Sequence, residues 1–526
     1  MLLLSYSNFV FLFCMMVSSC NKTTSQNINQ DPSFKRTSYY FSNEGNDAND
    51  GSLQHPMQSI KALNALHLNN GDSALFKGDE TFDGNILLTI NNASSKNFVL
   101  TSYGNDTAII NAGNGTAIEI DQSKNISISN IICKGSGRKD GNTKAGIAIN
   151  NCSNINISNI YVSGFQKAGL QLYDCINTNV NNINTHDNGF AGISVDGDYG
   201  NRLSSHNINI TNCSAVNNPG DPTNFTNHSG NGIIVGNCTN VLIDYCTATN
   251  NGWDMPRIGN GPVGIWCYEA DSVIIQHCIS YKNKTSKGGE DGGGYDFDGG
   301  TTNSVIQYCL SYENYGSAFG IFQYAGAGNW YNNTIRFCIS ENDGKVSAAH
   351  AGAYIWNSSH DSTQFKDFLF YNNTIYNDSG AAISYSVESD HSNFKFFNNI
   401  FIAAGELLRG KYGSDIFLAN DWWSLKNVFN VNGENNFANW CKANNKEQMN
   451  GVIKGLNVNV SFKNAGNTML ADVNGLSAFD NYGIVGISAV TQSGIDLQAL
   501  SNINIGDKDF NGKAADKNFM GACTHQ

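Results

Sequence analysis

A cysteine recurs along the middle of this sequence at nearly constant intervals. Successive members of the series are 33, 32, 31 and 29 residues apart: Cys213, Cys246, Cys278, Cys309 and Cys338. An asparagine follows each of them after four or five residues: Asn217, Asn250, Asn283, Asn314 and Asn342. Repetition with a period of this size indicates stacked copies of one supersecondary unit, in which each copy buries its apolar surface against the next.

The repeating unit consists of short apolar runs of strand length. Residues 146–149, 192–195, 232–235 and 264–267 each begin with glycine and continue with a period-two pattern in which β-branched residues are frequent. This pattern is typical of strands. No segment of helix length with a 3.6-residue period interrupts them. The sequence therefore predicts an all-β solenoid, a parallel β-helix in which each strand pairs with its counterpart one coil away at about 4.8 Å.

The cysteine series has a structural explanation. The chain holds 14 cysteines, but parallel strands in register do not favour the Cβ separation of about 3.8 Å that a disulfide needs. No Cys-x-x-Cys pair suggests a zinc site. We expect buried thiols that fill the interior of the coil. The asparagines that follow them are expected to form one column of turns with their amides stacked along the axis.

The composition is that of a turn-rich β protein. Charged residues make up only 14% of the chain and hydrophobic residues 40%, so the chain has enough apolar side chains for a core and is not disordered. The net charge is −13 and no basic patch with interleaved aromatic residues is present, which argues against nucleic acid as a partner. No subunit contact is indicated, and we expect a monomer.

The first 20 residues resemble a bacterial lipoprotein signal. The apolar stretch ends in Val17-Ser18-Ser19-Cys20, and Cys20 would carry the lipid after cleavage. No Lys or Arg precedes Cys20, which leaves an ordinary signal peptide or a misassigned start as alternatives. We expect export to the bacterial outer membrane, with a membrane anchor at Cys20 and residues 21–38 as a flexible tether.

Three regions follow the tether. Residues 39–115 are expected to form the N-terminal cap and the first coils, with Ile60, Leu63 and Leu66 at helical spacing in a capping helix. Residues 116–405 carry the regular coils, and residues 406–526 form the last coils and an irregular C-terminal cap. Caps are expected at both ends because open strand edges would otherwise template aggregation.

Several segments carry a resemblance to a known superfamily. They are the opening Gly-Asn-Asp-Ala-Asn-Asp-Gly at 45–51 with Pro56, Gly71-Asp72 and Gly78, the Tyr-Asn-Asn-Thr-Ile-Tyr at 371–376, and Gly521-Ala522. With them the chain resembles the right-handed parallel β-helix (pectin-lyase-like) superfamily of secreted bacterial carbohydrate-active proteins. The resemblance implies the right-handed fold and a polysaccharide substrate. The superfamily includes lyases, hydrolases, epimerases and adhesins, so fold does not settle function. The Asn-Thr-Asp, Asp-Asp and Gly-His-Gly set of polygalacturonases is missing, and so is the calcium-and-arginine signature of pectate lyases.

The repetition breaks on one face of the coil. When the strand after each inter-coil loop is aligned from its glycine, every second side chain points outward. One strand then projects two carboxylates, Asp296 and Asp298. Its neighbours project mainly aromatic side chains and one further acid: Trp266, Tyr268, Phe322, Tyr324, Tyr354, Trp356 and Asp196. Exposed rings beside acids suit a sugar polymer, because rings stack on pyranose faces while carboxylates bind hydroxyls or transfer protons.

Long insertions precede these strands and are expected to build walls around this face. They cover residues 217–231, 251–262, 282–293 and 341–352. Arg257 and His350 are the substrate-binding candidates in these insertions. The insertions also carry further charged residues, for which solvated loop charge is the alternative interpretation: Asp254, Lys282, Lys284, Lys287, Glu290 and Lys345. Glu269 follows the Trp266 strand and is the candidate third acid, with a rim carboxylate as the alternative interpretation.

Three functions are compatible with this pattern. The first is hydrolysis of glycosidic bonds in a polysaccharide, with Asp296 and Asp298 as acid and base or nucleophile and Glu269 in support. The second is a lyase on a uronate polymer. In it Ca²⁺ is bound by Asp291 and the two other aspartates, and a Lys, Arg or His from the loops removes the C5 proton. The third is glycan binding without catalysis, in which the glycine-rich segment 291–300 is a plain turn.

Overall fold

The computed structural model describes residues 37–92, 94–199, 203–345, 349–386, 390–486 and 488–523. The proposed lipidation site Cys20 and residues 21–36 of the expected tether lie outside these residues. None of the described helices is long and apolar enough to cross a membrane.

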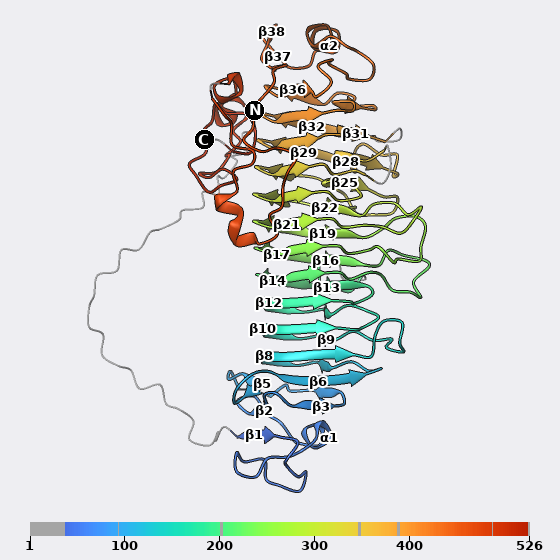
Figure 1. The fold of residues 1–526 in the computed structure, drawn as a ribbon, viewed down its shortest axis with the longest axis vertical. Helices are drawn as coiled ribbons and strands as arrows, with labels where there is room; N and C mark the ends of the chain where they lie inside the picture. Colours follow the sequence, from blue (N-terminus) through green and yellow to red (C-terminus); the bar gives the residue numbers. More distant parts are fainter. Residues whose placement is uncertain are drawn as a thin grey trace, which may run out of the picture. The chain divides into compact units, whose positions relative to one another are not determined.

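The described residues from β1 to β36 form a stack of coils, and each regular coil contributes a strand to each of three faces (Figure 1). All pairings between coils are parallel in the described strands, with the exception of one short hairpin near the C-terminal end. The first two faces belong to one 24-stranded sheet because the long strands β8 (Lys124–Gly135), β10 (Ser153–Ser163) and β12 (Ile176–His186) run through the bend between them. The third face is a separate 12-stranded sheet.

The remaining strands of the first face are β1 (Ser38–Phe41), β2 (Ser73–Lys77), β5 (Phe98–Tyr103), β14 (Ser205–Thr211), β17 (Cys238–Asp244), β20 (Asp271–Gln276), β23 (Val305–Gln307), β26 (Asn333–Arg336), β29 (Lys366–Tyr371), β32 (Ser392–Phe397) and β35 (Ile416–Leu418). Those of the second face are β3 (Thr81–Asp83), β6 (Ala108–Gly113), β15 (Ser214–Val216), β18 (Thr247–Thr249), β21 (Ile279–Tyr281), β24 (Leu310–Tyr312), β27 (Ile339–Glu341), β30 (Thr374–Asn377), β33 (Ile400–Ala403) and β36 (Asp421–Ser424). The third face consists of β4 (Ile86–Leu88), β7 (Ile118–Asp121), β9 (Ile147–Asn150), β11 (Leu170–Tyr173), β13 (Ala191–Asp196), β16 (Asn231–Gly236), β19 (Val263–Tyr268), β22 (Gly293–Phe297), β25 (Phe319–Gln323), β28 (Ala351–Asn357), β31 (Ala381–Tyr385) and β34 (Leu408–Arg409).

The core fills the inside of the coils with stacked columns of apolar side chains. On the third face, Ile193, Ile233, Ile265 and Tyr295 pair in register from coil to coil, and all four are fully buried. Identical spacing places similar side chains above one another, so each coil buries the apolar surface of the next. The all-β fold class predicted from the sequence is confirmed.

The cysteine column is made of thiols, as predicted. All twelve cysteines of the described residues are buried and free. The repeating ones lie at the bend between the first and second faces, where each thiol donates to the carbonyl two residues earlier, as Cys278 does to Gln276 (3.0 Å) and Cys309 to Gln307 (3.2 Å). They therefore satisfy the backbone at the bend in addition to filling the core.

The asparagines after the cysteines belong to two neighbouring columns, which corrects the single column expected. Asn217 and Asn250 have left-handed backbone (φ 55° and 54°). The residues that follow them form a buried ladder with Asn283 and Asn314, in which each amide donates to the next side chain: Asn188, Asn218, Asn251, Asn283, Asn314 and Asp343. Some of the asparagines follow their cysteine after four residues and others after five. This difference of one residue determines the column to which an asparagine belongs.

The N-terminal end is closed by the short helix α1 (Ile60–Asn64). Ser59 caps it by accepting from the N–H of Ala62, and Ile60 and Leu63 are buried against the first coils. A helix is therefore present in the predicted segment, with Leu66 beyond its end, and its capping role stays a prediction.

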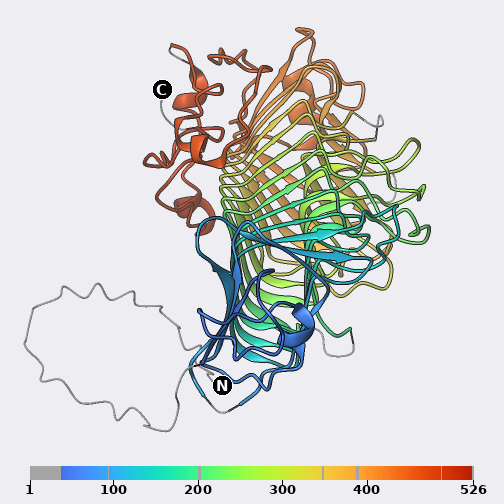
Figure 2. The same ribbon diagram turned by 60° about the horizontal axis from the view of Figure 1, so that its bottom comes forward.

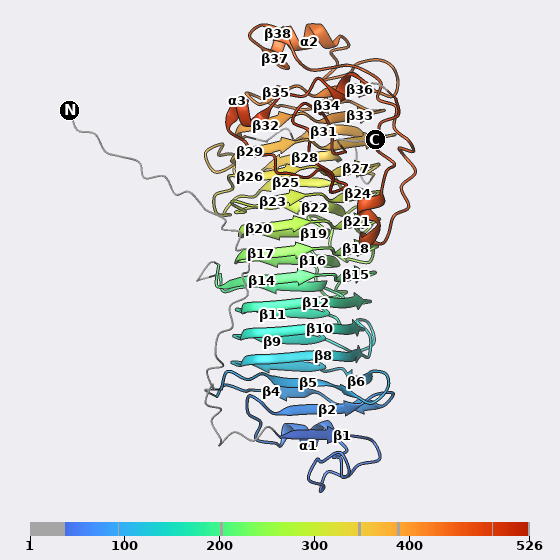
Figure 3. The ribbon, with the colours of Figure 1, turned by 90° about the vertical axis from the view of Figure 1, so that its left-hand side faces the viewer.

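The C-terminal region covers a side of the stack as well as its end. After β36 the chain forms α2 (Phe437–Asn444) and the hairpin of β37 (Gln448–Met449) and β38 (Val452–Ile453). It then turns back along the outside with η1 (Val473–Ala478), η2 (Ala489–Thr491) and α3 (Leu497–Ser501), as the red segment in Figures 2 and 3 shows. Apolar residues of this segment pack on the outer surface of the second face, in a cluster that joins Tyr312 and Ile339 with Tyr482.

Buried Glu341 fixes this returning segment to the second face. Its carboxylate accepts from the N–H and the hydroxyl of Thr468 (2.8 and 2.7 Å), from Gly466 N–H and from the Tyr482 hydroxyl. These contacts lie on the second face. The long insertions described from the sequence lead instead into strands of the third face.

Candidate functional site

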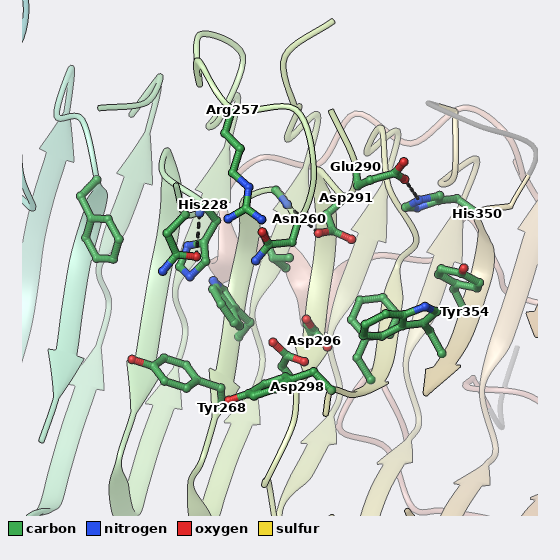
Figure 4. Close-up of a pocket in the computed structure, with 18 of the residues that line it drawn as sticks. His228, Arg257, Asn260, Tyr268, Glu290, Asp291, Asp296, Asp298, His350 and Tyr354 are labelled. Atoms are coloured by element: carbon green, nitrogen blue, oxygen red, sulfur yellow. Dashed lines mark hydrogen bonds and ion pairs between the residues drawn. The ribbon is translucent and has the colours of Figure 1, made fainter. Parts of the chain in front are cut away.

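A cavity of about 960 Å³ lies on the outer surface of the third face, over β13, β16, β19, β22, β25 and β28 (Figure 4). Its walls come from the loops that lead into these strands. Every residue predicted to bind substrate lines it: Asp196, Arg257, Trp266, Tyr268, Phe322, Tyr324, His350, Tyr354 and Trp356. Asp291, Asp296 and Asp298 line it as well. The structure thus gathers these residues in one place, and their roles remain predictions.

Parallel register sets the neighbours of Asp296. It pairs with Trp266 on one side and with Gly320 on the other, and Gly320 in turn pairs with Tyr354. Alignment of the strands from their glycines predicts Phe322 as the neighbour of Asp296. This prediction is wrong, because the actual register differs from that alignment by two residues. Phe322 instead pairs with Trp356, one outward position further along the strands.

Glycines on the outer surface make room for the cavity and its rings. A Cβ atom on Gly320 would lie 2.8 Å from Oδ1 of Asp296. A Cβ on Gly236 would lie 2.2 Å from the ring of Tyr268, and one on Gly299 would lie 2.5 Å from the ring of Tyr324. Both tyrosine rings therefore lie against bare backbone, which sets their orientation at the edge of the cavity.

Asp196 holds Tyr268 in place. The Tyr268 hydroxyl donates to Oδ2 of Asp196 (3.0 Å) and lies 3.2 Å from the Tyr199 hydroxyl. Oδ1 of Asp196 accepts from the N–H of Gly197 and the amide of Asn237 (2.8 Å each). Asp196 therefore has partners for both oxygens and serves to position an aromatic ring.

Asp296 is the most deeply buried acid of the cavity. It is 3% exposed, and its Oδ1 is buried with no hydrogen-bond partner. Burial first, and then the charges of Asp298 and Asp291, raise the pKa of Asp296 well above its usual range. Its surroundings therefore favour the protonated form of the carboxyl group.

Asp298 differs from Asp296 in its hydrogen bonding. One carboxylate oxygen accepts from the N–H of Gly299 (2.7 Å), which favours the ionised form. Burial opposes this and raises the pKa of Asp298 to about 7, with smaller contributions from Asp291 and Glu269. Two acids two residues apart thus have different environments, and Asp298 is the one that ionises first.

Glu269 is not among the residues that line the cavity. It has left-handed backbone (φ 45°), and its carboxylate accepts from the N–H of Gly328 (2.7 Å). A Cβ on Gly300 would lie 2.4 Å from this carboxylate, so the side chain packs under the turn after β22. Glu269 therefore lies at the end of the Trp266 strand but outside the cavity lining, and its role as a third acid stays a prediction.

The loop walls carry Arg257 and the pair of Glu290 and His350. Arg257 donates to the carbonyl of Thr226 (2.5 Å), and its guanidinium points into the cavity from above the acids in Figure 4. His350 is 3% exposed and its Nε2 lies 3.8 Å from a Glu290 oxygen. The nearby imidazole of His350 lowers the pKa of Glu290.

The other charged loop residues lie elsewhere. Asp254 forms ion pairs with Arg138 and Lys139, and Lys282 and Lys345 lie 3.3 and 3.7 Å from Glu313. Lys284 and Lys287 do not line the cavity either. No lysine is among the lining residues.

The comparisons with known proteins agree with this architecture. Residues 221–366 match a family model described as "Right handed beta helix region". The chain is a right-handed parallel β-helix protein. No curated protein matches it in sequence.

Solved structures similar to this β-helix protein have several activities in their names. They include pectate lyase Pel9A (15% identity, TM-score 0.45, 94% of this chain and 97% of that one), and PfbA, a surface adhesin of Streptococcus pneumoniae (13%, 0.44, 65% and 85%). A third is the GH136 lacto-N-biosidase from Eubacterium ramulus (14%, 0.39, 71% and 67%). With TM-scores below 0.5 these likenesses carry no argument, and function has to be argued from the cavity of this chain.

The aspartates of this β-helix do not form the cluster that the calcium prediction requires. Within the described residues, no group of three or more His, Cys, Asp and Glu side chains is placed to hold a metal ion. The carboxylate of Asp291 is turned to the N–H of Gly261 in a loop (2.7 Å), while that of Asp298 binds Gly299. Asp291 and Asp298 are thus each held by a backbone N–H rather than directed at a shared centre.

Several lining residues were not predicted from the sequence, and His228 is the most informative of them. Phe190, Tyr199, Asn227 and Asn260 are others. The insertion at 217–231 was recognised as a wall, but no pattern distinguishes its inward-facing residues. Their direction depends on the path of a loop, which has no side-chain period to follow.

Proposed function

We propose that this protein hydrolyses glycosidic bonds of a polysaccharide, with Asp296 as general acid and Asp298 as general base or nucleophile. The observation that carries the proposal is the pair of acids with different environments in a cavity lined by aromatic rings. Such pairs are what acid–base cleavage of an acetal needs, because one group must give a proton while the other is ionised.

Asp296 suits the acid role because it keeps its proton. Its burial and the neighbouring carboxyl groups disfavour the charged form. Protonation of the leaving oxygen removes charge from that oxygen as the bond breaks, and a positioned acid of this kind contributes roughly 10²- to 10⁴-fold.

Asp298 suits the complementary role because the Gly299 N–H stabilises its carboxylate. It comes two residues after Asp296, directly after the end of β22, and two residues of extended chain place the Cα atoms about 6.6 Å apart. That spacing is compatible with both the shorter carboxyl separation of retaining enzymes and the longer one of inverting enzymes. We therefore leave the stereochemistry out of the proposal.

The aromatic residues are proposed as sugar subsites on both sides of the acids. Trp266 and Tyr268 lie toward the N-terminal coils, while Phe322, Tyr354 and Trp356 lie toward the C-terminal coils. Rings on both sides would bind sugars on either side of the bond that is cleaved.

The test is release of reducing ends from a panel of neutral and acidic polysaccharides. Wild-type protein is expected to be active on a member of the panel, and Asp296→Asn and Asp298→Asn are each expected to lose at least about 100-fold. Asp121→Asn is the matched control, because Asp121 lies in β7 on the outer surface of the same third face but does not line the cavity. Full activity of both cavity variants would refute the proposal.

The same assay distinguishes hydrolysis from the lyase function and from glycan binding without catalysis. A lyase would give an unsaturated product that absorbs in the ultraviolet, and a glycan-binding protein would retain a polysaccharide without any product. Either result would replace the hydrolase proposal.

A further inference from the structure

His228 enters the cavity from the wall that precedes β16. It is 9% exposed. Its ring makes an edge-to-face contact with Trp266 (centroids 4.9 Å apart) and lies 5.8 Å from the ring of Phe190. These contacts fix the plane of the imidazole beside the aromatic subsite that adjoins Asp296.

The amide of Asn231 has one orientation only. Its Nδ2 donates to the carbonyl of Phe190 (3.0 Å), and a carbonyl can only accept. Its Oδ1 accepts from the indole N–H of Trp266 (3.2 Å), and an indole N–H can only donate. A flipped amide would lose both hydrogen bonds, and Asn231 is fully buried.

This orientation determines the tautomer of His228. The second hydrogen of Nδ2 of Asn231 is directed at Nδ1 of His228 (3.0 Å), so Nδ1 is the acceptor and the ring proton is on Nε2. Burial, followed by the charge of Arg257, lowers the pKa of His228 to about 4. Besides four tyrosines, the titratable and charged groups that share this cavity are Arg257, Glu290, His350 and the four aspartates Asp196, Asp291, Asp296 and Asp298.

The donor on Nε2 is available to a ligand. Nε2 of His228 makes no hydrogen bond to any residue that the structure describes. It is also not among the fully buried polar atoms, so it faces the cavity that His228 lines. A fixed neutral donor in an aromatic pocket selects for an acceptor, such as a hydroxyl, ring or acetal oxygen of a sugar.

We propose that His228 is a specificity-determining residue: a neutral hydrogen-bond donor, with its tautomer fixed by Asn231, that binds an acceptor oxygen of the sugar beside Trp266. The sugar part rests on the proposed function, whereas the tautomer part stands on the hydrogen bonds alone. His228 takes no proton in the reaction, because its free nitrogen already carries one and the other accepts from Asn231. The role of proton transfer is left to Asp296 and Asp298.

The first test measures the tautomer without any substrate. In ¹⁵N-labelled wild-type protein at pH 7, the NMR signals of His228 are expected to show a protonated Nε2 and an unprotonated Nδ1. Asn231→Asp is expected to reverse this or to charge the ring, because a carboxylate accepts from Nδ1–H. A wild-type His228 that is protonated on Nδ1 at pH 7, alone or on both nitrogens, would overturn the inference even if the protein proves to be a glycosidase.

The second test separates donation from packing. His228→Gln retains an N–H donor of similar reach and His228→Ala has none. On the polysaccharide that wild type cleaves, His228→Ala is expected to raise KM by about tenfold with kcat nearly unchanged, while His228→Gln recovers most of the loss. Equal loss in both variants would show a packing role only.

The pH dependence of kcat/KM tests separately whether His228 transfers a proton in the reaction. Because His228 is not an acid or a base in the reaction, the limbs of kcat/KM against pH should be the same in His228→Gln as in wild type. Loss of a limb would overturn the inference and make His228 a proton-transfer group. If instead the acid variants retain full activity while the NMR result holds, it is the proposed function that fails and not the assignment of the donor.

Discussion

Gly320 pairs directly with Asp296 across β25 and β22, and a Cβ atom on Gly320 would lie 2.8 Å from the Asp296 carboxylate. The backbone of Gly320 is not in the left-handed region. Gly320→Ala is therefore a test of space rather than of backbone strain. We expect at least a tenfold loss of activity, because the methyl group displaces the acid from its position.

A double-mutant cycle checks the cause of this loss. The destabilisation by Gly320→Ala, measured by chemical denaturation, should be smaller in the Asp296→Ala background, where the carboxylate is gone. Identical destabilisation in both backgrounds would mean that the two residues do not contact each other as described.

The activity should depend on pH through the two aspartates. Asp298 has to be ionised and Asp296 protonated, so kcat/KM should be bell-shaped. Its acidic limb should lie near pH 7, from the Asp298 pKa of about 7, and its alkaline limb should come from Asp296, whose pKa is raised well above its usual range. A profile that is flat from pH 5 to 9 would contradict these assignments.

Trp356 is expected to bind sugar by its ring face. Trp356→Ala should raise KM by roughly tenfold with a smaller effect on kcat, since stacking holds the substrate before and during reaction. Trp253→Ala is the control, because Trp253 is 44% exposed but does not line the cavity. Equal effects of the two substitutions would argue against a subsite at Trp356.

Asp421 links pH to stability at the C-terminal end of the stack. It is fully buried, its Oδ2 has no partner, and burial raises its pKa from 3.8 to about 8. The folded state therefore holds a proton that the unfolded state releases. The contribution of this group is fully present below about pH 4 and is lost as the pH rises toward 8.

Asp421→Asn should remove this dependence. The amide can still accept from the N–H of Val458 (3.0 Å in the wild type) and does not ionise. We expect the variant to have a higher Tm than wild type at pH 8.5 and a similar one at pH 4.5, by thermal unfolding. Asp361→Asn, at a partly exposed loop position, should show no such difference between the two pH values. A lower Tm of Asp421→Asn at pH 8.5 would contradict the raised pKa.

The sequence was sufficient to predict the fold and the outward direction of the site residues, but not their register. Tyr295 and Phe297 face the core and Asp296 faces the cavity, as alternation predicts, because the side-chain period of a strand is two. A slip of two residues preserves this alternation, so no pattern distinguished Gly320 from Phe322 as the neighbour of Asp296. The glycine at the start of a strand was not a reliable marker, since loop lengths differ between coils.

Glu269 and His228 show where strand periodicity ends. Glu269 is turned away by one left-handed residue. His228 is placed by a loop whose direction is set by the hydrogen bonds of Asn231. In both cases the position depends on tertiary contacts that no short-range pattern in the sequence encodes.

The central claim is the division of roles between Asp296 and Asp298, and one comparison tests it most directly. On an aryl glycoside of the sugar that wild type releases, the leaving group departs without help from an acid. Asp296→Asn should then be nearly as active as wild type, although it loses at least about 100-fold on the polysaccharide. Asp298→Asn should be impaired on both substrates. Equal impairment of Asp296→Asn on the two substrates, or full activity of Asp298→Asn on either, would contradict the account.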